Sequence, residues 1–173
     1  MAFHKDTRAF MSYLQNNRPV RDRIRAKPDR TLLYAGHFFE PMWQEIERLK
    51  KTSPEINALQ TLPDVLATIP SPDPSLPSLK AHVEALTRAV PWMPDGFITW
   101  RALSGIFASN ASGRVYFCVG SDISKVNKVL AATEVTVLLR NANIDATTRN
   151  IVEWLNVCVQ TGKTDINFGF LPS

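Results

Sequence analysis

Apolar residues recur at helical spacing along much of this chain, with polar residues on the positions between them. In residues 5–16, for example, Phe10, Met11 and Leu14 share one face. Several such segments begin beside an N-capping residue or a proline and end beside a glycine or a proline, as helices do. The pattern predicts helices over residues 5–16, 19–27, 38–51, 60–68, 78–90, 122–133 and 146–161.

Short runs rich in β-branched and aromatic residues lie between the predicted helices, and such runs typically form buried strands. They predict strands over residues 31–35, 114–119, 134–140 and 165–170. The segment 96–109 is ambiguous, and we interpret it as a strand followed by a short helix. From residue 114 onward the order is β-α-β-α-β, which requires parallel strands joined by right-handed crossovers. The expected fold class is therefore α/β, with a small mixed sheet and an N-terminal helical, basic layer; mixed α+β is the alternative.

The segment 70–77 (PSPDPSLP) has four prolines in eight residues and cannot form a regular helix or a central strand. We interpret it as a stiff connector between a helical, basic part (residues 1–69) and an α/β part (residues 78–173). Because 69 residues of short helices make only a thin core, the expected organisation is a single domain over residues 1–173.

Positive charge is concentrated near the N-terminus. Residues 1–30 hold eight Lys or Arg against three Asp or Glu, whereas the remaining residues hold twelve against thirteen. Most of the excess lies in residues 18–30 (RPVRDRIRAKPDR), called the arm below. Its cations are Arg18, Arg21, Arg23, Arg25, Lys27 and Arg30.

The arm predicts a short helix that begins at Pro19, ends before Pro28 and packs on the rest of the protein through Val20 and Ile24. Arginine suits phosphate and carboxylate groups, because its planar guanidinium can donate two parallel hydrogen bonds. The arm contains no aromatic residue, which favours backbone phosphates or an acidic protein surface over stacked bases.

The expected function is therefore that of a small intracellular interaction protein that binds a polyanion, either a nucleic-acid backbone or an acidic protein surface. The competing interpretation of the arm is a solvated helix whose arginines pair with Asp22, Asp29 and the glutamates of the next helix.

The ends of the predicted C-terminal strands form a second candidate site. Open α/β sheets bind ligands at the carboxyl ends of their strands, where Ser121 and Asn141 would offer donors to an anion beside a helix N-terminus. The alternative is that Ser121, Asp122 and Asp145 only cap helices.

A third candidate surrounds the predicted strand 31–35, where His37 follows the strand in a loop and could exchange protons. Arg30, Tyr34 and His37 around this strand are similar to the opening strand of ADP-ribosyltransferases, a resemblance that implies that an arginine or a histidine here helps to hold a nicotinamide cofactor. The later serine-containing strand and the catalytic-glutamate motif of that family are not found, so the chain is not assigned to it. This candidate supports the competing class, an enzyme such as a bacterial toxin or effector that acts on a nucleotide or a nucleic acid.

Aromatic residues cluster in WMPDGFITW, between Trp92 and Trp100. They could form a partner-binding loop, or simply aromatic core. A third function class follows from the first interpretation, namely a structural or assembly subunit that forms a homo-oligomer.

No metal site and no cofactor are expected. The three histidines are far apart, and neither Cys118 nor Cys158 belongs to a C-x-x-C pair. Both cysteines lie in apolar runs, which indicates buried thiols and a reducing compartment. No secretory signal and no apolar run of the ~18 residues that a membrane span needs is found, so a cytoplasmic protein is expected. Secretion without a cleaved signal would leave the same pattern.

Overall fold

Helices make up most of this structure, a computed structural model that describes residues 6–35, 42–119, 133–162 and 169–172. The helices are α1 (Thr7–Gln15), α2 (Arg18–Arg23), α3 (Met42–Thr52), α4 (Pro54–Asn57), α5 (Leu62–Leu66), α6 (Leu79–Ala89), α7 (Phe97–Ser109), α8 (Val135–Leu139) and α9 (Ala146–Thr161). A helical turn at Trp92–Gly96 leads directly into α7. The strands are β1 (Thr31–Ala35), β2 (Val115–Val119) and β3 (Gly169–Leu171).

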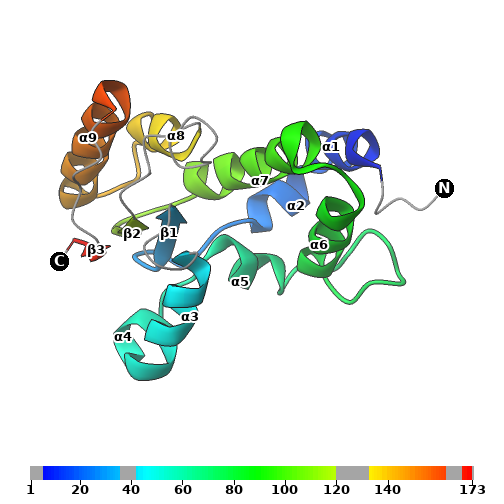
Figure 1. Cartoon of the computed structure of the whole chain (residues 1–173), viewed down its shortest axis with the longest axis horizontal. Coiled ribbons are helices and arrows are strands. Elements are labelled where there is room, and N and C mark those ends of the chain that lie inside the picture. Colours follow the sequence, from blue (N-terminus) through cyan, green and yellow to red (C-terminus); the bar gives the residue numbers. More distant parts are fainter. Residues whose placement is uncertain (1–5, 36–41, 120–132, 163–168, 173) are drawn as a thin grey trace.

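A small mixed sheet has the strand order β1-β2-β3. β1 and β2 are parallel, with Thr31 opposite Val115, and β3 runs antiparallel to β2 (Figure 1). The strands predicted over residues 31–35 and 114–119 are therefore confirmed. β3 overlaps the end of the strand predicted over residues 165–170, most of which lies outside the described residues.

The strand predicted over residues 134–140 is wrong, because Val135–Leu139 forms the helix α8. A short apolar run does not distinguish a buried strand from a buried helical segment, since neither shows a polar face. The helix predicted over residues 122–133 lies almost entirely outside the described residues. The β-α-β-α-β unit is therefore not confirmed, and the fold is a mixed helix-and-strand domain.

Within the segment 96–109, residues Phe97–Ser109 form one continuous helix, α7, and not the strand and short helix that we expected. Its buried residues include Phe97, Leu103 and Phe107 together with the polar Thr99 and Ser104. Because α7 is buried over much of its circumference, its sequence lacks a clear polar stripe and its helical period is weak.

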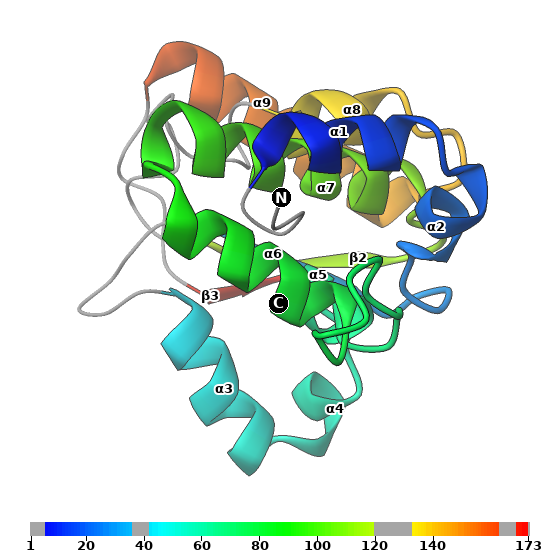
Figure 2. The same cartoon turned by 90° about the vertical axis from the view of Figure 1, so that its right-hand side faces the viewer.

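The two faces of the sheet pack against different helices. Leu33, Phe117 and Val119 join the main core, which also receives residues of α1, α6, α7, α8 and α9. Leu32 and Cys118 point to the opposite face and join a smaller cluster that includes α3. Figure 2 shows α7, α8 and α9 on one side of the sheet and α3 on the other. The chain forms a single compact domain around these two clusters.

The proline-rich segment 70–77 links α5 to α6 within this domain. Ile69 and Leu79, at its two ends, are both buried in the main core, and the Leu79 amide donates to the Ile69 carbonyl at 2.7 Å. The connector therefore leaves and re-enters the same core.

Candidate functional site

The helix of the arm is shorter than predicted. α2 ends at Arg23, and Ile24 has left the helical conformation (φ −80°, ψ 72°). The side-chain amide of Asn110, at the end of α7, donates to the carbonyls of Arg21 and Ile24 at 2.9 and 3.0 Å. If α2 continued, these two carbonyls would accept hydrogen bonds from amides of its next turn. Because Asn110 donates to them instead, this contact helps to end the helix.

Beyond α2 the arm alternates between buried and exposed side chains. Ile24 and Ala26 are buried, whereas Arg23, Arg25 and Lys27 are exposed. The prediction that Ile24 anchors the arm is confirmed, and Val20 also packs against the main core. The alternation places the apolar side chains in the protein and the intervening cations in solvent.

Two further contacts tie the arm to the rest of the protein. The Lys27 amide donates to the side-chain oxygen of Gln60 at 2.7 Å. Asp29 adopts a left-handed conformation (φ 63°) and accepts a hydrogen bond from the Arg114 amide at 2.6 Å. Gly113 is required beside it, because a Cβ at this position would lie 2.1 Å from the Asp29 carboxylate and its own φ is +71°.

The six cations of the arm differ in how they are engaged. Arg21 donates to the carbonyls of Leu14 and Gln15, at the end of α1, and Arg23 makes a long contact of 3.5 Å to the Thr68 carbonyl. Arg18 forms an exposed ion pair with Asp22 at 3.7 Å. Within the described part of the chain, the side chains of the remaining three make no hydrogen bond or ion pair. These three, called the outer cations below, are Arg25, Lys27 and Arg30, and all are exposed.

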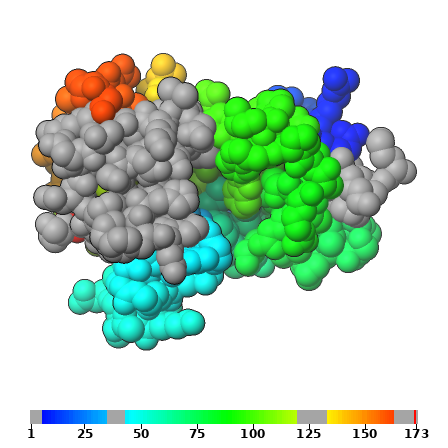
Figure 3. All heavy atoms as spheres, in the orientation of Figure 1, coloured from blue at the N-terminus to red at the C-terminus, as the bar shows by residue number. Residues whose placement is uncertain are grey.

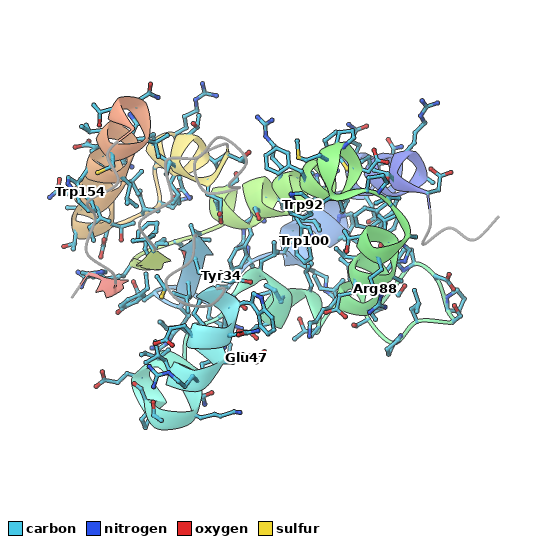
Figure 4. All side chains as sticks on the ribbon, viewed as in Figure 1. Tyr34, Glu47, Arg88, Trp92, Trp100 and Trp154 are labelled. Carbon is cyan, nitrogen blue, oxygen red and sulfur yellow. The ribbon has the colours of Figure 1, made fainter. Side chains whose placement is uncertain are left out.

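A cleft of about 740 Å³ lies elsewhere on the molecule, between β1, α3, α5, α6 and α7. Figure 3 shows it as a hollow between α3 (cyan) and α6 (green). Aromatic side chains from four elements line it: Tyr34 of β1, Trp43 of α3, Trp92 of the turn before α7, and Trp100 of α7. In Figure 4, Tyr34, Glu47, Trp92 and Trp100 gather around this hollow, whereas Trp154 lies apart on α9.

Two ion pairs neutralise much of the charge in the cleft. Lys50 contacts Asp64 at 2.5 Å, and Lys80 contacts Glu84 at 3.5 Å. Burial alone would raise the pKa of Asp64, but hydrogen bonds from the Lys50 ammonium and from Thr61 hold that pKa below its ordinary value. Each pair joins one basic and one acidic side chain, so the two pairs together add no net charge to the cleft.

Glu134, which directly precedes α8, also lines the cleft and is only 5% exposed. It forms no hydrogen bond or ion pair with any described residue, and its burial raises the pKa of the carboxyl to about 8. Burial also raises the pKa of Tyr34 to about 12, and the nearby carboxylates of Glu134, Asp64 and Glu47 add to that increase. The cleft thus combines aromatic walls with a buried acid.

The structure describes two of the three residues of the third predicted site. Tyr34 lines the cleft, whereas Arg30 is exposed on the arm and is not among the cleft residues. His37 lies outside the described residues, so its placement relative to Tyr34 stays a prediction.

Asn141, from the predicted strand-end site, has a structural role. Its amide nitrogen donates to the carbonyls of Ala108 and Ala111 at 2.9 Å, and its oxygen accepts from the Asn143 amide at 2.8 Å. It closes the end of α7, and its donors are occupied, so we do not carry it forward as an anion ligand. Ser121 lies outside the described residues. Asp145 caps α9, as the alternative interpretation had it.

Reasoning from the sequence missed Glu134, Glu47 and Trp43 as parts of a common site, although it singled out Tyr34, Trp92 and Trp100. A glutamate that opens the otherwise apolar run EVTVLL was the available signal, because a charged residue beside such a run is at risk of burial. Nothing in the order of residues along the chain showed that this glutamate faces β1 and α7.

Cys118 and Cys158 are buried, on β2 and α9, and burial raises the pKa of the Cys118 thiol to about 11. A thiol of this kind is a poor nucleophile.

In the ranges that the structure describes, no group of three or more His, Cys, Asp or Glu side chains is arranged to hold a metal ion. Nor does any helix there have the length and apolar character needed to cross a membrane.

Comparison with protein-family models, curated protein sequences and solved structures finds no match to this chain. Inferences about function therefore rest on the arm and the cleft themselves.

Proposed function

We propose that the protein binds a polyanion through the arm, either a nucleic-acid backbone or an acidic protein surface. The observation that carries this proposal is the exposure of the three outer cations, Arg25, Lys27 and Arg30, whose side chains form no hydrogen bond or ion pair with described residues. A side chain that already forms contacts within the protein would have to break them before it could bind a ligand, whereas the side chains of the outer cations would not.

The anchoring of the arm supports the same proposal. Ile24 is fully buried, Asn110 and Gln60 bind the backbone of the arm, and the Arg114 amide binds the side chain of Asp29. A segment held in this way loses less conformational entropy on binding than a disordered tail would. It would therefore keep more of the free energy gained from its contacts with phosphates or carboxylates.

Charge reversal tests the proposal. The variant combines Arg25→Glu, Lys27→Glu and Arg30→Glu, and leaves Arg21 unchanged because that side chain supports α1. Binding to a short fluorescent single-stranded RNA, to duplex DNA and to a poly-glutamate peptide is measured by fluorescence anisotropy over a series of salt concentrations. For a nucleic acid, we expect a loss of affinity of roughly 10- to 100-fold at low salt and a salt dependence shallower by about two to three ions.

A matched triple variant controls for net charge. Lys51→Glu, Arg88→Glu and Arg140→Glu change the same number of charges at exposed positions away from the arm. This control should keep most of the affinity. Equal losses in both triple variants, or no loss in either, would contradict the proposal. Retained binding to nucleic acid but not to poly-glutamate, or the reverse, identifies the kind of polyanion.

The enzyme and assembly alternatives stay predictions. The enzyme alternative joined Arg30, Tyr34 and His37 in one site, and of the two that the structure describes, Tyr34 lines the cleft and Arg30 does not. We therefore place the binding proposal ahead of it.

A further inference from the structure

The carboxyl group of Glu134 has no described partner, and this needs an explanation. The residue is 95% buried and lines the cleft, and no hydrogen bond or ion pair connects it to another described residue. Burying an acidic group without a partner costs stability. Residues that carry such a cost often belong to sites where a ligand supplies the missing contact.

The charge balance of the cleft indicates the sign of that ligand. Lys50 and Lys80 are matched by Asp64 and Glu84, so the lysines leave no excess positive charge. Of the acidic residues that line the cleft, Glu47 and Glu134 are left over. A ligand that completes this site would carry positive charge.

The aromatic walls indicate the chemical character of the ligand. The faces of indole and phenol rings attract cations, and Trp43, Trp92, Trp100 and Tyr34 all line the cleft. Trp43 and Trp92 are about half exposed (48% and 49%), so a ligand can reach them from solvent. A metal ion would instead need several oxygen, nitrogen or sulfur ligands converging on one point, and no such group exists among the described residues.

We propose that this cleft binds a small organic cation, an alkyl- or arylammonium whose charge lies against Glu134 and whose apolar groups contact the tryptophans. Its volume of about 740 Å³ lies within the range of small-molecule sites. This site is independent of the polyanion surface, because it shares no residue with the arm and has the opposite charge.

Binding would release a proton. In the empty cleft Glu134 is protonated at neutral pH, because its pKa is about 8. An arriving cation favours the carboxylate, so the neutral acid becomes a carboxylate paired with the ligand, and one proton passes to solvent. The other titratable groups that line the cleft are Tyr34 of β1, Glu47 and Lys50 of α3, Asp64 of α5, and Lys80 and Glu84 of α6.

Tryptophan fluorescence offers a direct assay. The sequence has four tryptophans, of which three line the cleft and one, Trp154, lies on α9. The Trp154→Phe variant therefore restricts the signal to the cleft. It is titrated with choline, with benzyltrimethylammonium and with 3,3-dimethylbutan-1-ol, in which a carbon replaces the charged nitrogen of choline.

The proposal expects a saturable change with at least one of the two cations, and affinity for the neutral alcohol about tenfold or more weaker than for choline. Glu134→Gln, which keeps the size of the side chain, should weaken cation binding by about tenfold or more and leave binding of the alcohol unchanged. The control Glu153→Gln removes an exposed carboxylate on α9 and should change neither.

Calorimetry of the unaltered protein provides a second measurement that does not depend on how well the variants fold. Binding enthalpies in buffers with different heats of ionisation should show release of up to one proton per cation bound at about pH 7. The inference is overturned if neither cation saturates the signal, if choline and the alcohol bind equally well, or if no proton is released. The variant in which the three outer cations are replaced by glutamate should bind choline and benzyltrimethylammonium normally. Failure of the cleft proposal can therefore be distinguished from failure of the polyanion proposal.

Discussion

The arm and the cleft use charge in opposite ways. On the arm, apolar side chains enter the core and the three outer cations stay in water. In the cleft, by contrast, a carboxyl group is buried beside aromatic rings without a described partner. The stability of the arm thus comes from its anchors and not from its outer cations. In the cleft, the buried carboxyl group itself lowers stability, which is typical of a site that binds a ligand.

The largest effect expected from this contrast is on stability in the arm. Ile24→Ala should lower the free energy of unfolding by about 2–5 kcal/mol, because the side chain is fully buried in the main core. Arg25→Ala, at the next residue, should change it by less than about 0.5 kcal/mol, since that side chain is exposed. Urea denaturation followed by circular dichroism measures both. Comparable losses in the two variants would mean that the outer cations also support the fold.

The pH dependence of stability tests the cleft. Because the pKa of Glu134 is raised from 4.5 to about 8, the folded protein holds more protons than the unfolded chain between these two values. Stability should therefore fall as pH rises through this window and level off above it, with a loss from this group of about 3 kcal/mol between about pH 5 and pH 7.4.

Glu134→Gln should remove this part of the pH dependence, so that the variant gains stability relative to the unaltered protein as the pH rises. Glu153→Gln should keep the original slope. Urea denaturation at several pH values is the measurement, and parallel curves for the unaltered protein and the Glu134 variant would show that the carboxyl is not buried as described.

The smallest expected effect concerns the contact between α7 and the arm. Asn110→Ala removes two hydrogen bonds to the carbonyls of Arg21 and Ile24, and should cost about 1–2 kcal/mol. Hydrogen exchange of the arm amides should also become faster, because this end of α2 loses an attachment. The neighbouring exposed variant Ser109→Ala serves as the control and should leave both quantities unchanged. An unaltered exchange rate in Asn110→Ala would show that the core residues alone hold the arm.

The fold was predictable wherever a segment has one buried and one exposed face. α1, α3, α6 and α9 follow from their apolar spacing, and β1 and β2 from runs of β-branched and aromatic residues. α7 and α8 were not predictable in this way, because α7 is buried on several sides and α8 is too short to show a period. We therefore expected a strand over residues 134–140, where the protein has the helix α8.

The candidate sites show the same limit. The arm could be found from the sequence, since its cations lie within thirteen consecutive residues. Even so, the end of α2 depends on Asn110, which is distant in the chain. The cleft brings Tyr34, Trp92 and Glu134 together through the packing of β1, α7 and the start of α8. No local sequence pattern predicts that these separate elements pack against one another.

The parallel pairing of β1 with β2 has a consequence for the newly synthesised chain. The residue that directly follows the arm, Thr31, pairs with Val115, which lies far along the sequence. A ribosome must therefore add 84 residues after Thr31, up to Val115, before β1 can begin to pair with β2. Contacts between residues so distant in sequence form late and slowly. Until then, the arm lacks its contacts with Asn110 and Arg114, so it is held less firmly on the growing chain than in the folded protein.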